Sequence, residues 1–334
     1  MRLLVHTGAL SGGVALELMD IVFLDQNKWI ELAQVHSGRT TSGPMAELFP
    51  QLVVAVQEKR VLFPLSGSNI METAKRNDPD SRRHVAETQA ILSLGYVHRS
   101  RAGRMAVELR AAIQRQFGVE PAAMPPHWAF APGFMQAFEP MDELMAVPEE
   151  LARVRWLNSL THPAALYLDY MVNQDDIRRR EAITTLTQGL TELVVRIESR
   201  RERFANESID FRRRAYAAQS WVDNLDLLNQ TVAALGYSFD QLRALGDRAM
   251  RALLEDVPTM NVEVEMAARL ESKTGALSAN DVLDMQSFYT AIPYSDRVVA
   301  EKAAISRAKQ ARLDSKYGVA LSRSLEDLLD LYVV

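Results

Sequence analysis

The stretch IVFLDQNKWIEL, residues 21–32, decides the fold. It opens with an uninterrupted apolar run at residues 21–24, which is rich in strand-forming side chains and ends at Asp25. A short run without polar alternation is typical of a strand that is buried on both faces of a parallel sheet. Residues 28–35 then repeat apolar side chains at helical spacing. We therefore predict a strand, a turn at Asp25 and a helix, which is the unit that α/β sheets repeat.

The same alternation continues downstream and returns near the end of the sequence. A second strand is predicted at residues 61–65, although Pro64 has no N–H to contribute to a sheet. The other expected elements are helices at 45–59, 70–75, 302–311 and 324–331, a helix that begins after Ser278, and strands at 297–300 and 317–321. Strands that alternate with helices in both terminal regions predict a single parallel sheet of about four strands.

The middle of the sequence has long helical periods and almost no strand signal. Helices are expected over roughly 81–96, 100–117, 150–160, 164–205, 208–235, 239–255 and 260–272. We therefore predict four segments: a loose N-terminal tail at 1–18, the first part of the α/β core at 19–76, an all-α insertion at 77–275 and the second part of the core at 276–334. Met19 is the expected start of the folded unit.

Composition narrows the class of protein. The 334 residues include no cysteine, which excludes disulfides, thiolate zinc sites and cysteine nucleophiles and is compatible with a reducing cytoplasm. No apolar run reaches the ~18 residues that a membrane span needs, so we expect no membrane partner. The formal net charge is -5, so a nucleic acid would have to be attracted by a local basic patch.

Acidic residues fall where a parallel sheet would gather them. Asp25 follows the first strand, Glu72 lies in the helix after the second strand, and Glu301 follows the strand at 297–300. Asp281 and Asp284 lie three residues apart near the start of the preceding helix, so they project to one side of it. Because sites in open α/β sheets form at the carboxyl ends of the strands, these side chains are expected to meet there.

A group of carboxylates without cysteine or histidine partners suits hard divalent cations such as Mg²⁺ or Mn²⁺. Like charges held together repel one another, and a bound cation relieves that repulsion. Such a cation can also activate water for attack on a phosphodiester. The acidic positions therefore point to a metal-dependent hydrolase, with Asp25, Glu72, Asp284 and Glu301 as expected ligands and Asp281 beside them.

Three segments resemble a known family. FLDQNKWIEL, residues 23–32, is similar to the opening motif of PIN-like domains, and LSGSNIMETAK, residues 65–75, is similar to their second motif. SANDVLDMQSFYTAIPYSDRVVAEK, residues 278–302, is similar to the closing motifs of a bacterial PIN-like group. The resemblance covers roughly residues 19–76 and 276–334. One position departs from the pattern, because the family usually has an aspartate where this chain has Glu301.

The resemblance implies a divalent-metal-dependent endonuclease that cuts RNA and leaves 5′-phosphate and 3′-hydroxyl ends. It also implies a role as a toxin or in RNA turnover, and hence a protein partner such as an antidote. Two alternatives stay open: a DNA nuclease of similar fold, and a non-catalytic scaffold whose PIN-like core has lost activity.

Several residues have ordinary structural roles to set beside these functional ones. Asp25 and Asp281 could each cap a helix, and Glu72 could pair with Lys75 or Arg76 on its own helix. The expected supporting residues are Asn27, Ser68, Asp296, Lys75 and Arg76. Among them, Asp296 precedes its strand and is therefore expected at the opposite edge of the sheet. The many arginines between 178 and 214 alternate with acids, which favours a solvated helix face over a phosphate-binding surface.

Overall fold

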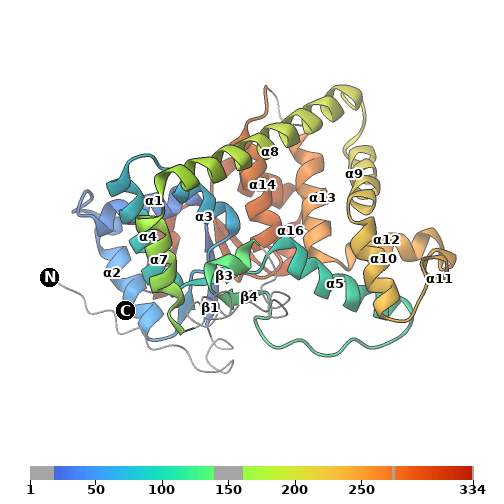
Figure 1. Cartoon of the computed structure of the whole chain (residues 1–334), viewed down its shortest axis with the longest axis horizontal. Helices are drawn as coiled ribbons and strands as arrows, with labels where there is room; N and C mark the ends of the chain where they lie inside the picture. Colours follow the sequence, from blue (N-terminus) through green and yellow to red (C-terminus); the bar gives the residue numbers. More distant parts are fainter. Residues whose placement is uncertain (1–18, 139–160, 273–274, 333–334) are drawn as a thin grey trace.

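The computed structural model describes residues 19–138, 161–272 and 275–332. The tail expected at 1–18 and the helix expected at 150–160 lie outside these ranges. The structure is mixed α/β, as predicted, with helices around a four-stranded parallel sheet (Figure 1). No helix in the described ranges is both long enough and apolar enough to cross a membrane.

Strand β1 (Asp20–Leu24) lies inside the sheet, whose order is β2-β1-β5-β6. Its neighbours are β2 (Val61–Leu62) and β5 (Arg297–Val299), and β5 also pairs with β6 (Ala320–Ser322). Residues from both terminal regions of the sequence thus share one sheet. β2 is shorter than predicted, because Leu65 instead bridges Val97 beyond Pro64.

Two hydrophobic clusters cover opposite faces of the sheet. Val22 and Leu24 belong to one cluster and Phe23 to the other, as expected when successive strand residues point to opposite faces. On the face of Val22 the sheet is covered by α1 (Gln26–His36), α2 (Pro44–Gln57), α4 (Pro79–Ser93), α7 (Pro163–Asn173), η4 (Leu325–Leu328) and α17 (Leu329–Tyr332). Helix α3 (Gly67–Ala74) contacts both α4 and the later helix α14 (Ala279–Ala291).

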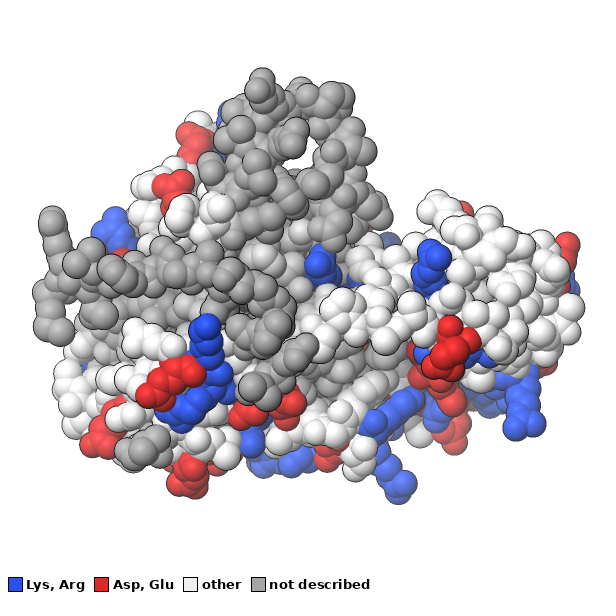
Figure 2. Space-filling view, turned by 90° about the horizontal axis from the view of Figure 1, so that it is seen from below, with Lys and Arg blue, Asp and Glu red and all other residues white. Residues whose placement is uncertain are grey.

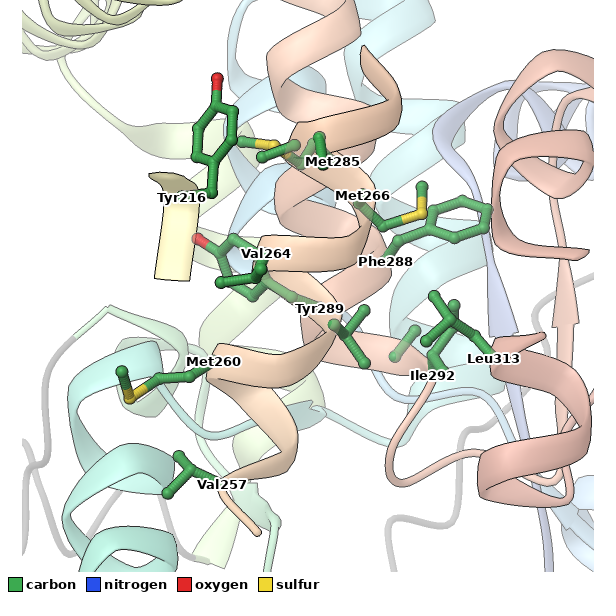
Figure 3. Close-up of a cluster of buried hydrophobic side chains, with 14 of the residues drawn as sticks. Tyr216, Val257, Met260, Val264, Met266, Met285, Phe288, Tyr289, Ile292 and Leu313 are labelled. Atoms are coloured by element: carbon green, nitrogen blue, oxygen red, sulfur yellow. The ribbon is translucent and has the colours of Figure 1, made fainter. Parts of the chain in front are cut away.

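The second face is covered mainly by helices from the expected insertion. They are α5 (Arg101–Gln116), α8 (Asp176–Arg203), α9 (Ile209–Asp223), α10 (Leu225–Ala234), α11 (Phe239–Ala244), α12 (Gly246–Glu255) and α13 (Pro258–Leu270). They share a continuous core with α14 (Ala279–Ala291), α15 (Lys302–Gln310) and α16 (Leu313–Tyr317). Figure 3 shows Met266 beside Phe288 and Val264 beside Tyr289 in this core. The helical region therefore does not form a core separate from the sheet.

Several expectations for the middle of the sequence need correction. Strands β3 (Tyr96–His98) and β4 (Phe130–Pro132) form an antiparallel pair where almost no strand was expected. A short 3₁₀ helix, η2 (Phe134–Ala137), follows them. The expected boundary at residue 76 is not a break in packing, because α4 packs directly against α1.

Three predicted helices are also interrupted. The one expected at 239–255 divides into α11 and α12, and the two longest divide at positions with a local cause. The helix expected at 164–205 divides into α7 and α8, because Asp175 accepts hydrogen bonds from the first N–H groups of α8 and begins a new helix. The helix expected at 208–235 divides at Asn224, whose side-chain amide donates to the carbonyl of Ser220.

Candidate functional site

Asp25 lies at the carboxyl end of β1. Its backbone N–H donates to the carbonyl of Val299 at 3.0 Å, which continues the pairing of β1 with β5. Its side chain accepts a hydrogen bond from the N–H of Gln26 at 2.7 Å and caps α1. The residue is 7% exposed, and burial, together with the nearby charge of Glu301, raises its pKa above the usual value. Asp25 therefore has the cap role and also faces a second carboxylate.

Glu72 is brought to this edge by the way α3 begins. Ser66 and Asn69 form a reciprocal cap at its start, and the amide of Asn69 donates to the carbonyl of Leu24 at 3.3 Å. This bond ties the first turn of α3 to the end of β1. Burial, followed by the charges of Asp25 and Asp284, raises the pKa of Glu72 to about 7.

Asp284 projects from α14 toward the same group. Burial, followed by the charges of Asp25 and Glu301, raises its pKa to about 7. Arg307 on α15 opposes this shift, and its guanidinium lies 4.0 Å from the carboxylate of Asp284. The pair holds a positive charge at the margin of an acidic site.

Glu301 is the exposed member of the set and precedes α15. Its carboxylate accepts a hydrogen bond from the side-chain amide of Asn27 in the first turn of α1. Asn27 is thus placed beside the acids that the sequence predicted it would support.

These four residues, Asp25, Glu72, Asp284 and Glu301, form what we call the carboxylate site. Within every pair of them, the charge of one member raises the pKa of the other. They come from segments that are far apart in the sequence. The parallel sheet and the helices that follow its strands therefore bring them into one electrostatic group, at the carboxyl ends of β1 and β5.

Two other acids are placed differently. The carboxylate of Asp281 accepts hydrogen bonds from the N–H and hydroxyl of Ser278, so it caps α14, and it raises the pKa of Asp284 only as the last of the causes. Asp296 lies at the amino end of β5, where it accepts from the N–H of Ile21 at 2.7 Å. This is the opposite edge of the sheet from Asp25, as expected, so Asp296 does not support the carboxylate site.

The remaining predicted supporting residues lie on α3 or just after it. Lys75 is close enough to Glu72 to lower its pKa, whereas the side chain of Arg76 donates to the hydroxyl of Ser81. Ser68 lies one turn before Glu72, and its hydroxyl is 2.6 Å from that of Ser287 on α14. The serine pair links the two helices that carry Glu72 and Asp284.

The oxygen-only chemistry of the site fits a hard divalent cation, because its carboxylates raise one another's pKa and a cation would offset that repulsion. Their side chains do not yet form a complete coordination shell: in the described ranges, no three His, Cys, Asp or Glu residues are grouped closely enough to ligate one ion. A cation would therefore have to draw the side chains closer together. The two glutamates have the longest side chains available for that movement.

Sequence reasoning missed some of the residues around these acids. Arg307 and Ser287 were not singled out, although each lies about one or two helical turns from a predicted acid. The arginines of the expected insertion form ion pairs with neighbouring acids, as the alternation of charges in the sequence indicated. Arg179 and Arg180 pair with Asp176, and Arg201 pairs with Glu198. Figure 2 shows a face on which the basic and acidic side chains are interspersed.

Comparison of the chain with protein-family models, with curated proteins and with solved structures finds no match.

Proposed function

We propose that the protein is a divalent-metal-dependent endonuclease with a PIN-like core, which hydrolyses phosphodiester bonds of RNA in the cytoplasm. The observation that supports this most strongly is the mutual repulsion of four carboxylates at the carboxyl ends of β1 and β5. Asp25, Glu72 and Asp284 are buried or half-buried and Glu301 is exposed beside them, and like charges held together in this way destabilise one another unless they take up protons or a cation. Mg²⁺ and Mn²⁺ match an all-oxygen ligand set.

Each part of the site has a role in this proposal. Asp25, Glu72, Asp284 and Glu301 would hold the cation, which supplies an activated water and stabilises charge on the phosphate when bound. Asn27 fixes the side chain of Glu301, and Asp25 is fixed by the N–H of Gln26. Lys75 and Arg307 offset part of the negative charge, so that a phosphate can approach.

One rival function has a specific observation in its favour. The described acids do not group tightly enough to ligate an ion as they stand, and Glu301 is a glutamate where the resembled family usually has an aspartate. Both features would suit a non-catalytic scaffold that keeps the PIN-like core. A DNA nuclease would use the same carboxylates, and substrate choice separates it from the RNA enzyme.

The test is cleavage of labelled RNA and labelled DNA by the full chain with Mn²⁺, with Mg²⁺ and with EDTA. We expect cleavage of RNA that needs the metal and is lost in Asp25→Asn. Asp296→Asn is the matched control, because it removes an acid from the opposite edge while its amide oxygen can still accept from Ile21. Metal-dependent cleavage of DNA but not of RNA would show that the protein is a DNA nuclease. If neither nucleic acid is cleaved, or if Asp25→Asn cleaves as well as the wild type, the nuclease proposal is wrong and the non-catalytic scaffold is the remaining function.

A further inference from the structure

A cavity of about 390 Å³ lies beside the carboxylate site. Its volume falls within the roughly 300–1,000 Å³ that is typical of small-molecule sites. It is enclosed by α3, α5, α8, α14, the end of β3 and the segment around η2. The lining includes His98, Arg99, Arg101, Arg104, Phe138 and Tyr289. We call this cavity the arginine pocket.

The pocket adjoins the carboxylates through two shared helices. Ser68 lines it and lies one turn before Glu72 on α3, while Leu283 lines it and directly precedes Asp284 on α14. The hydrogen bond between Ser68 and Ser287 joins the two helices at this point. A ligand in the pocket would therefore lie next to a phosphate held at the carboxylate site.

The charge of the lining favours an anion. Three arginines line the pocket, and the lining contains no Asp or Glu among the described residues. The guanidinium of Arg101 lies 2.6 Å from the carboxylate of Glu263, which is not part of the lining. Arg104 is 1% exposed and donates to the hydroxyl of Thr290. Burial lowers the pKa of Arg104 more than nearby Glu108 raises it. Because a buried guanidinium is stabilised by a negative partner, the pocket is suited to a phosphate.

Buried polar atoms in the wall point to a second kind of contact. His98 is 1% exposed, and neither of its ring nitrogens has a hydrogen-bond partner among the described residues; the same is true of Nε of Arg104. Such atoms cost free energy until something pairs with them. Burial and the charge of Arg104 hold the pKa of His98 well below its usual value, so the ring is neutral, with one donor and one acceptor.

The donor and acceptor of the His98 ring, unpaired within the described residues, favour some ligands over others. The ionised phosphodiester of a strand has no O–H and can only accept, so it could satisfy the N–H of His98 but not its other nitrogen. The edge of a nucleobase has both donors and acceptors. Phe138 and Tyr289 add aromatic surface to the lining, and such surfaces stack on bases.

We propose that the arginine pocket holds one nucleotide of the nucleic-acid strand next to the bond that is cut, with its phosphate near the arginines and its base toward His98. This inference rests on the proposed function, because it names the part of the substrate that the same site recognises. It also assigns a role to the helical region, since α5 and α8 supply walls of the pocket.

The first test fills the pocket without removing a polar group. Leu186→Trp enlarges a lining residue of α8, and Val195→Trp makes the same kind of change at an exposed position of that helix outside the lining. Binding of a short fluorescent single-stranded RNA is measured by anisotropy in EDTA, so that no cleavage is required. We expect Leu186→Trp to weaken binding about tenfold or more and Val195→Trp to leave it unchanged.

A second test separates recognition from folding. His98→Phe keeps a ring against Phe23 and Phe130 but removes two unpaired buried nitrogens. We expect an equal or higher melting temperature together with weaker RNA binding. A mixture of nucleoside 5′-monophosphates should compete with the RNA more strongly than inorganic phosphate does, because inorganic phosphate lacks the base that contacts His98 and stacks on the aromatic lining.

The outcomes distinguish this proposal from the proposed function. RNA binding that is lost in both pocket variants, without metal-dependent cleavage by the wild type, would keep the pocket and overturn the nuclease. Cleavage by the wild type with unaltered RNA binding in Leu186→Trp and His98→Phe would keep the nuclease and overturn the pocket. Equal competition by inorganic phosphate and by the nucleotides would overturn the contact between the base and His98.

Discussion

The side-chain amide of Asn27 donates a hydrogen bond to Glu301, which lies 274 positions later in the sequence. The bond joins the first turn of α1 to the start of α15, at the point where β1 and β5 both end. An exposed glutamate would otherwise sample many rotamers. Asn27 therefore acts as a positioning residue for the acid that departs from the resembled pattern.

Asn27→Ala is predicted to impair cleavage through Glu301 rather than through folding. With its partner removed, Glu301 must be ordered when the metal binds, so we expect the apparent metal affinity to fall about tenfold. Stability should change by less than about 0.5 kcal/mol, because Asn27 and Glu301 are exposed. Cleavage titrated with Mn²⁺ and a melting curve measure the two effects. Saturating Mn²⁺ should restore most of the rate, and a rate that stays low at saturation would contradict a positioning role.

The raised pKa of Glu72 predicts a stability that falls as the pH rises. Its pKa goes from 4.5 in the unfolded chain to about 7 in the folded protein. The contribution of a protonated Glu72 is thus fully present below about pH 4.5 and is lost as the pH rises through about 7. Glu72→Gln cannot ionise, so the variant does not lose this stability as the pH rises. We expect the variant to gain ~2 kcal/mol over the wild type between about pH 5.5 and pH 8.5, as measured by urea unfolding in EDTA.

The control for that experiment is an acid that lies outside the carboxylate site. Asp296→Asn lies at the opposite edge of the sheet and should run parallel to the wild type across the same pH range. A Glu72→Gln curve that is also parallel to the wild type would show that the pKa of Glu72 is not raised in the folded protein.

Divalent metal is predicted to stabilise the folded chain most at alkaline pH. Above about pH 7 Glu72 and Asp284 are ionised, and a cation that binds only the folded state raises stability by mass action. We expect Mg²⁺ or Mn²⁺ to raise the melting temperature by several degrees at about pH 8.5 and far less at about pH 5.5. EDTA should reverse the effect, and Asp25→Asn should abolish it. A shift of the same size in Asp25→Asn would place the cation elsewhere.

Much of the sheet could be predicted because its two central strands contain short apolar runs. The run at residues 21–24 ends at Asp25 and has no polar alternation, and residues 298–300 repeat that pattern before Glu301, so both strands and the edge that carries the acids could be expected. An acid in the first turn of a helix was harder to interpret, because it can either cap the helix or belong to a site. Asp281 satisfies a helix cap, a local role that leaves its carboxylate engaged with Ser278.

The pocket could not be predicted, because it depends on elements that have weak local signals. β3 is only three residues long and pairs with β4 more than thirty positions later, so His98 seemed to belong to a helical region. Arg101 and Arg104 lie one turn apart on α5, which is equally typical of a solvated helix face. Only the folded structure, in which α5 packs against α10, α12 and α13 and Arg104 donates to Thr290 on α14, shows that Arg104 is buried.

Arg307→Gln is predicted to move the pH dependence of cleavage to higher pH. The guanidinium of Arg307 lowers the pKa of Asp284, against burial and the charges of Asp25 and Glu301, which raise it. Without that cation, Asp284 keeps its proton to a higher pH, and metal binding must compete with the proton for longer. The midpoint of the acid limb of the rate profile should therefore rise by about half a pH unit or more. Lys309→Gln is the matched control, because it removes an exposed cation from the same helix. An unchanged midpoint in Arg307→Gln, or the same shift in both variants, would mean that the pair of Arg307 and Asp284 does not set the protonation of the site.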